Sequence, residues 1–182
     1  MQQRPICTLP MPTHDPREVR DVSRLESILG GVGGGLIAFD GCPSAGKTAL
    51  MNRIAVNRKW PAIDFDPYIE CERGEFVNAL RLPDLTAAIA CARLQSPVVL
   101  VAGVCMREVL ERIGITAVQH VYVQRNSPMD IPGDLDILDL EDGRPLGDTS
   151  LLNELDLEVA TYHARYRPRS HADIIYVRTG LD

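Results

Sequence analysis

The stretch that decides the fold is residues 36–48, which read LIAFDGCPSAGKT. Four apolar residues and an aspartate come first, as expected of a short buried strand. The last eight residues match the pattern G-x-x-x-x-G-K-[ST], and Leu50 and Ile54 follow at a spacing typical of a helix. A strand, a glycine-rich turn and a helix in this order bring backbone N–H groups and a helix N-terminus to one point. The sequence therefore predicts a loop that binds the phosphates of a nucleotide.

The residue types in this loop have specific chemical uses. Glycine lets the backbone wrap closely around a polyphosphate. Lys47 is expected to reach the β- and γ-phosphates, and Thr48 to give its hydroxyl to Mg²⁺. ATP and Mg²⁺ are the predicted cofactors, and ATP is favoured over GTP because the guanine-reading pattern Asn-Lys-x-Asp does not occur. The predicted nucleotide-binding residues are Gly41, Cys42, Pro43, Ser44, Ala45, Gly46, Lys47 and Thr48.

Two further expectations concern side chains of this loop. Lys47 should be solvated when no ligand is bound. Cys42 should lie beside inward-pointing amides, which favour the thiolate form of a cysteine. Alkylation of Cys42 is therefore expected to block nucleotide binding.

Short apolar runs and helical segments alternate along the rest of the chain. This alternation predicts an α/β protein with three layers, in which helices cover both faces of a five-stranded parallel sheet. The five expected strands are residues 36–40, 62–65, 98–102, 117–124 and 174–177. The expected helices include residues 46–58, 107–113 and 150–167, with two more between residues 69 and 97.

The 182 residues fit one domain. Residues 1–14 hold three prolines and read as a flexible arm, so the domain is expected to span 15–182. Asp15 and Pro16 are typical of a helix start, which predicts a helix running from there to Leu29. Residues 126–149 show neither the apolar run of a buried strand nor the spacing of a helix. A loop of that length is typically a functional lid or disordered.

Composition excludes several classes of protein. The net charge of −6 argues against binding nucleic acid. The longest apolar run falls far short of the ~20 residues that a membrane helix needs. The five cysteines form no CxxC pair, which favours the reducing cytoplasm and argues against a zinc site. The expected partner is a small molecule, and the chain is expected to be a monomer or a homodimer.

Two carboxylates follow the second expected strand. Asp64 and Asp66 are two residues apart, so in an extended chain they point to the same side. The carboxyl ends of parallel strands face the ligand in such sheets. The alternative is a turn cap, a role that Asp66 before Pro67 suits. Residues 98–102 end without an acid, which leaves two explanations. The favoured one is that this pair supplies the metal shell; the other is that the protein binds nucleotide but hydrolyses it or transfers its phosphate poorly.

These motifs resemble those of the P-loop kinases of small metabolites, in outline shikimate kinase and then uridine kinase. The resemblance implies a P-loop NTPase fold of the nucleoside or shikimate kinase type. The resemblance implies that Asp64 lies near the metal and that Asp66 meets the hydroxyl of the acceptor. Residues 144–146, Arg-Pro-Leu, resemble the lid of shikimate kinase, which implies that Arg144 contacts the nucleotide phosphates. Adenine would lie near residues 178–180. The glycine triplet after the third strand of shikimate kinase is here Ala-Gly-Val, so the resemblance does not name the acceptor.

Other charged residues leave alternatives open. Arg165, Arg167 and Arg169 either contact phosphate or compensate the dipole of the last helix. Arg107 follows the third expected strand, and it either faces the ligand or lies outside the site. The acidic residues between 130 and 142 are better explained as a solvated loop than as a site for a cationic substrate.

The sequence thus predicts an ATP-dependent phosphotransferase that moves the γ-phosphoryl group of Mg·ATP to a hydroxyl of a small molecule. Lys47, Asp66 and Arg144 are the predicted catalytic residues, and Thr48 and Asp64 the metal ligands. The alternatives are a nucleotide-dependent regulatory ATPase and an inert nucleotide-binding protein.

Overall fold

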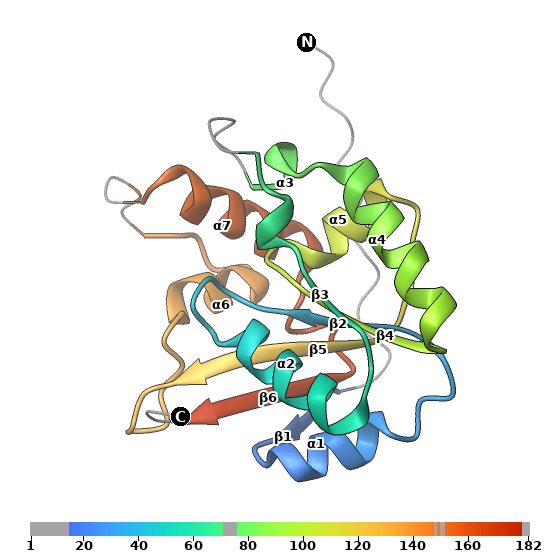
Figure 1. Ribbon diagram of the computed structural model, residues 1–182. Helices are drawn as coiled ribbons and strands as arrows, with labels where there is room; N and C mark the ends of the chain where they lie inside the picture. Colours follow the sequence, from blue (N-terminus) through green and yellow to red (C-terminus); the bar gives the residue numbers. More distant parts are fainter. Residues whose placement is uncertain (1–14, 71–75, 148, 150–151, 180–182) are drawn as a thin grey trace.

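The computed structural model describes residues 15–70, 76–147, 149 and 152–179 (Figure 1). Six parallel strands form one sheet in the order β1-β6-β5-β2-β4-β3. The strands are β1 Arg17–Val19, β2 Gly35–Asp40, β3 Ala62–Asp64, β4 Val98–Ala102, β5 Ala117–Asn126 and β6 Ile174–Thr179. The helices are α1 Val22–Leu29, α2 Lys47–Arg58, the 3-10 turn η1 Asp66–Tyr68, α3 Phe76–Ala79, α4 Leu82–Gln95, α5 Met106–Arg112, α6 Leu135–Glu141 and α7 Glu154–Tyr166.

Two hydrophobic cores lie on opposite faces of the sheet. Successive residues of β2 alternate between them, as the pleat of a strand requires: Leu36 and Ala38 belong to one core, Ile37 and Phe39 to the other. Helices α4, α5 and α7 cover the first face, and α1 and α2 cover the second (Figure 1). The central strand β2 is buried on both faces, which explains its continuous apolar run.

The predicted strand count of five is wrong, because β1 is a sixth strand. A helix was expected from Asp15 onward, yet Arg17–Val19 pairs in parallel with the start of β6. Helix α1 begins later, after Asp21, whose carboxylate accepts a hydrogen bond from the N–H of Arg24 at 2.8 Å. Val19 fits a helical apolar stripe and a buried strand position equally well, so only the pairing with β6 decides between them.

Residues 126–149 were predicted to form a loop, but they contain helix α6. Leu138 of α6 packs against Tyr122, Ile175 and Val177 of the sheet. The predicted helix 150–167 corresponds to α7, which begins after a capping box of Asn153 and Asp156. The arm predicted for residues 1–14 lies outside the described residues. In the described part of the chain, none of the helices has the length and apolarity needed to cross a bilayer.

Truncation of Leu25 tests the packing of α1. Its side chain is fully buried in the core that also contains α2. We expect Leu25→Ala to lower the free energy of unfolding by about 2–5 kcal/mol, because it leaves a cavity that the neighbours fill only in part. Urea unfolding followed by circular dichroism measures this loss. The control is Leu94→Ala on α4, where the leucine is 89% exposed and a change within about 0.5 kcal/mol is expected.

Candidate active site

The loop between β2 and α2 is a backbone cradle at the carboxyl end of the central strand. Ser44 and Gly46 have φ angles of 59° and 90°, and Gly41 has a φ of 142°. A Cβ at Gly41 would lie 2.5 Å from the carbonyl oxygen of Val123, so only glycine fits there. Gly46 is the N-cap of α2 and has no side chain to occupy the N-terminus of the helix. This geometry fits the phosphates of a nucleotide, as predicted from the motif.

Lys47 begins α2 and lies inside the loop. Its side chain donates to the carbonyl oxygens of Gly41 at 3.0 Å and Cys42 at 2.7 Å. The residue is only 7% exposed, so the expectation that it is solvated without ligand is wrong. Burial lowers the pKa of Lys47, and the nearby carboxylates of Asp40 and Asp66 partly oppose this effect. The ammonium group thus lies beside the place where the loop would hold phosphates.

One cavity of about 660 Å³ brings together four residues predicted from the sequence. Lys47, Thr48, Asp64 and Asp66 all line it. Asp64 is the last residue of β3 and pairs in register with Ala102 of β4, which places it at the same edge of the sheet as the loop. Asp66 begins η1 and is exposed to solvent.

The two aspartates interact with each other. The Asp64 carboxylate accepts a hydrogen bond from the backbone N–H of Asp66 at 3.2 Å, so Asp64 also stabilises the turn. Loss of water around its carboxyl raises the pKa of Asp66, and the negative charge of Asp64 raises it further. A pair of neighbouring carboxylates of this kind is stabilised by a cation between them.

The donor set fits a magnesium ion that arrives with its nucleotide. Mg²⁺ typically takes one or two protein carboxylates, several waters and the oxygens of substrate phosphates. Thr48 and Asp64 can supply a hydroxyl and a carboxylate to the cavity. Among the described residues, no cluster of three or more His, Cys, Asp or Glu side chains could hold a metal without such help.

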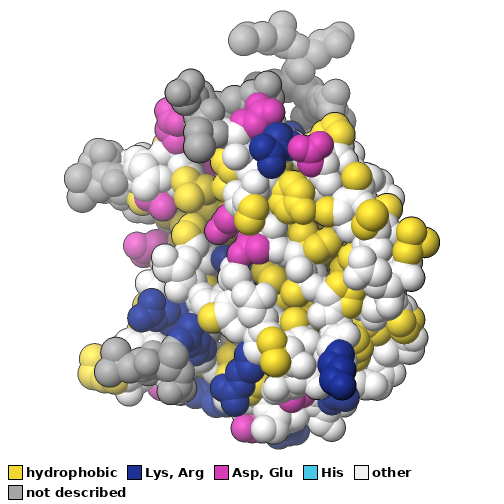
Figure 2. All heavy atoms as spheres, viewed as in Figure 1, with side chains coloured by type: hydrophobic (Ala, Val, Ile, Leu, Met, Phe, Trp, Pro, Cys, Tyr) yellow, Lys and Arg dark blue, Asp and Glu magenta, His cyan; other side chains and the backbone are white. Residues whose placement is uncertain are grey.

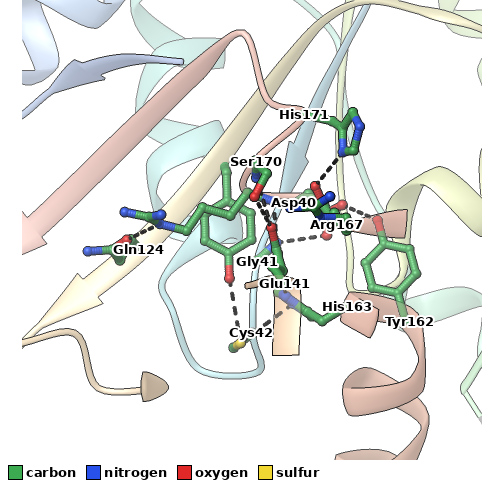
Figure 3. A network of polar contacts seen from close by, with 12 residues as sticks. Asp40, Gly41, Cys42, Gln124, Glu141, Tyr162, His163, Arg167, Ser170 and His171 are labelled. Carbon is green, nitrogen blue, oxygen red and sulfur yellow. Dashed lines mark hydrogen bonds and ion pairs between the residues drawn. The ribbon is translucent and has the colours of Figure 1, made fainter. Parts of the chain in front are cut away.

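Cys42 points away from the cradle and into the core (Figure 3). Its sulfur lies 3.7 Å from the hydroxyl of Tyr122 and 3.8 Å from Nε2 of His163. Burial raises the pKa of Cys42 to about 12. The predicted thiolate is therefore wrong, because the buried position of this side chain favours the neutral thiol.

The orientation of Cys42 predicts slow alkylation. At pH 8 we expect iodoacetamide to modify Cys42 at least about tenfold more slowly than Cys91, because the reactive species is the thiolate and Cys42 is buried and protonated. Cys91 lies on α4 and is exposed. Peptide mass spectrometry over time measures both rates in one sample. Modification of Cys42 at the rate of Cys91 would contradict the buried orientation.

A network of buried polar side chains, which the sequence did not predict, contacts the start of the loop (Figure 3). The carboxylate of Asp40, the last residue of β2, accepts hydrogen bonds from the N–H of Gly41 at 2.8 Å and from the hydroxyl of Tyr162. Burial raises the pKa of Asp40. In the sequence, only the position of Asp40 directly before the loop could have indicated this role. Asp40 thus joins the start of the loop to α7.

Glu141 and His163 form the second half of this network. Oε1 of Glu141 lies 2.8 Å from Nδ1 of His163, and both side chains are almost fully buried. Ser170 donates to Glu141 through its N–H and its hydroxyl, each at 2.8 Å. Burial alone would raise the pKa of Glu141, but the hydrogen bonds from His163 and Ser170 outweigh it and lower the pKa. The contacts fasten α6 to α7, and His163 then reaches Cys42 of the loop.

The candidate arginines lie outside the 660 Å³ cavity, and none of the described residues lining it is an arginine. Arg144 is exposed and pairs with Asp139 at 2.9 Å. Arg107 donates to the carbonyl oxygen of His171 at 2.6 Å and lines a separate small cavity with His120, so it does not face the cradle. Arg165 stacks over the ring of Tyr166, Arg169 donates to Gln124, and Arg167 is the C-cap of α7.

Two other features flank the cradle. Arg178 on β6 lies against Gly46, beside a cavity of about 150 Å³. The acidic segment 130–142 makes contacts within the chain: Asp130 pairs with Arg20 at 2.8 Å, and Asp139 with Arg144. Both carboxylates are thus paired with arginines of the same chain.

The sheet order, the cradle and one solved structure with a TM-score above 0.5 together define the fold, which is P-loop kinase-like. A possible uridine kinase from Bacillus stearothermophilus is similar at a TM-score of 0.53 and 13% identity, over 85% of this chain and 96% of that chain. A candidate fructose transport system kinase from Silicibacter sp. TM1040 has a TM-score of 0.46 and 14% identity, over 90% and 100%. Shikimate kinase from Aquifex aeolicus has a TM-score of 0.38 and 17% identity, over 78% and 86%. No protein-family model matches the sequence, and neither does any curated protein.

Proposed function

We propose that the protein is a kinase that moves the γ-phosphoryl group of ATP to a hydroxyl of a small molecule. The observation that carries this proposal is the single cavity that Lys47, Thr48, Asp64 and Asp66 line together. A regulatory ATPase also needs the phosphate cradle and a group that orients the attacking water, but it does not need a cavity large enough to hold an acceptor. A volume of about 660 Å³ is within the range of small-molecule sites.

Each residue has a role in the proposed reaction. The loop amides and Lys47 hold the β- and γ-phosphates. Thr48 and Asp64 hold Mg²⁺, which when bound neutralises charge on the phosphate oxygens. Asp66 orients the acceptor hydroxyl and accepts its proton. The acceptor oxygen bonds to the γ-phosphorus as the bond from that phosphorus to the departing ADP breaks.

The catalytic role of Arg144 remains a prediction. Its ion pair with Asp139 must open before the guanidinium can reach a phosphate. Both side chains are at least one-third exposed, so breaking this ion pair costs little free energy.

The experiment is a screen of ATP consumption over a metabolite library, with mass spectrometry of the products. A kinase yields ADP and a phosphorylated acceptor in equal amounts. ADP with free phosphate alone would indicate a regulatory ATPase, and nucleotide affinity without turnover would indicate an inert binder. Either result contradicts the proposal.

A further inference from the structure

One wall of the cavity is apolar and lies outside the phosphate-binding loop. Ile69, Phe76, Val104 and Leu155 line it, and they come from four different segments of the chain. Phe76 and Val104 are each 7% exposed and belong to the core beneath α4, α5 and α7. Ile69 and Leu155 pack against the same core while remaining partly open. A wall continuous with the core is held in place, and it offers apolar surface to a ligand.

Glu158 fixes the part of this wall that contains Phe76. Its carboxylate on α7 accepts hydrogen bonds from the N–H groups of Phe76 at 2.5 Å and Val77 at 2.9 Å. These contacts attach α3 to the helix that carries Leu155. They also occupy the two N–H groups, which are therefore not available to an anionic ligand.

The charges in the cavity are unevenly distributed. The ionisable residues among the described lining are Lys47, Asp64 and Asp66. Lys47 already contacts the loop carbonyls and lies where the phosphates would bind. The space left for an acceptor therefore has the Asp66 carboxylate on one side, next to Asp64 at the proposed metal position, and apolar side chains on the other. Figure 2 likewise shows acidic and hydrophobic side chains adjoining near the middle of one face, while most of the visible basic side chains lie in its lower part.

We propose that the acceptor is a hydroxyl compound with an apolar body and no negative charge, either neutral or cationic, which lies against Phe76 and Leu155 with its hydroxyl toward Asp66. This inference rests on the proposed kinase function and adds the chemical class of the substrate. An acceptor carboxylate would have to lie near the Asp66 carboxylate and the nucleotide phosphates, and juxtaposed like charges weaken binding. A protonated amine would instead be attracted to Asp66.

Three probes that differ by one charged group test the proposal. They are para-(hydroxymethyl)benzylamine, para-methylbenzyl alcohol and para-(hydroxymethyl)benzoate, which share one ring and one primary alcohol. Calorimetry measures their binding to the full chain with Mg²⁺ and a non-hydrolysable ATP analogue. We expect the amine and the neutral alcohol to bind at least about tenfold more tightly than the benzoate. Equal or tighter binding of the benzoate, or no binding of the other two, would overturn the inference.

A pair of variants on α7 locates the effect. Leu155→Arg puts a cation into the wall and should change the ratio of benzoate to alcohol affinity by about tenfold or more in favour of benzoate. The control Leu157→Arg adds the same charge at a site on the same helix that is 42% exposed, and it should leave the ratio unchanged. Equal shifts in both variants would contradict a role for the wall. If Leu155→Arg does not fold, the three-probe order in the unmodified protein still decides.

The outcomes separate this inference from the function on which it rests. If the library screen finds an anionic acceptor, the kinase proposal stands and the inference on substrate class falls. If the probes bind in the expected order but no phosphoryl group is transferred to any acceptor, the kinase proposal falls and the charge preference of the cavity stands.

Discussion

Lys47→Ala should lower the rate of phosphoryl transfer by about 10²–10³-fold or more, which is the typical loss when one preorganised donor to a developing charge is removed. The ammonium group of Lys47 lies inside the loop, where it can follow the γ-phosphate as charge builds on its oxygens. No described side chain in the cavity carries another positive charge that could replace it. Steady-state rates of ADP formation with a saturating acceptor measure the loss.

The chain supplies a matched control for this experiment. Its only other lysine, Lys59, is exposed and is the C-cap at the opposite end of the same helix. Lys59→Ala removes the same charge from α2 and should leave the rate unchanged. Circular dichroism establishes that both variants are folded, which matters because Lys47 also bonds to two loop carbonyls. A folded Lys47→Ala protein with an unchanged rate would end the kinase proposal.

Asp66→Asn should reduce transfer by about 10²–10⁴-fold, the usual contribution of a general base or orienting carboxylate. The amide keeps the shape of the side chain but accepts no proton from the acceptor. Affinity for ATP should stay nearly normal, because Asp66 is assigned to the acceptor. The raised pKa of Asp66 adds a pH dependence: activity should decline as the pH falls through that pKa, since the protonated form accepts no proton. A rate–pH profile of the unmodified protein measures this decline.

Asp64→Asn should behave differently, because Asp64 is assigned to the metal. The amide oxygen can still accept the hydrogen bond from the N–H of Asp66, so the turn should survive. The variant should need more Mg²⁺, and extra Mg²⁺ should partly restore its rate. Asp66→Asn should show no such rescue. Titration of both variants with Mg²⁺ decides: rescue of Asp66→Asn alone would exchange the two roles, and full activity of both would reduce the pair to a turn cap.

The sequence could predict those features that depend on residues close together in the chain. Residues 36–48 encode the strand, the turn and the helix start within a dozen residues, so the cradle and its place at the carboxyl end of β2 were predictable. Asp64 and Asp66 could be placed in the same way, because the end of a parallel strand fixes the edge at which its residues lie. Long-range packing decided the features that were missed.

The missed features share a dependence on distant partners. Strand β1 has three residues and becomes a strand only through pairing with β6. Helix α6 is stabilised by Leu138 against the sheet and by Glu141 against Ser170, neither of which a local pattern reveals. The direction of Cys42 depends on which side of the loop Tyr122 and His163 occupy.

The place of β6 between β1 and β5 has a consequence for the order of folding during synthesis. Arg17 leaves the ribosome long before Ile174, its partner in the sheet. At about 5–20 residues per second, the first strand waits roughly eight to thirty seconds for the last one. Until then Val19 has no neighbouring strand, and β5 keeps an open edge that could pair with another chain. Insertion of β6 pairs it with β1 and β5 in one step. A nascent chain should therefore gain protease resistance late and abruptly rather than strand by strand.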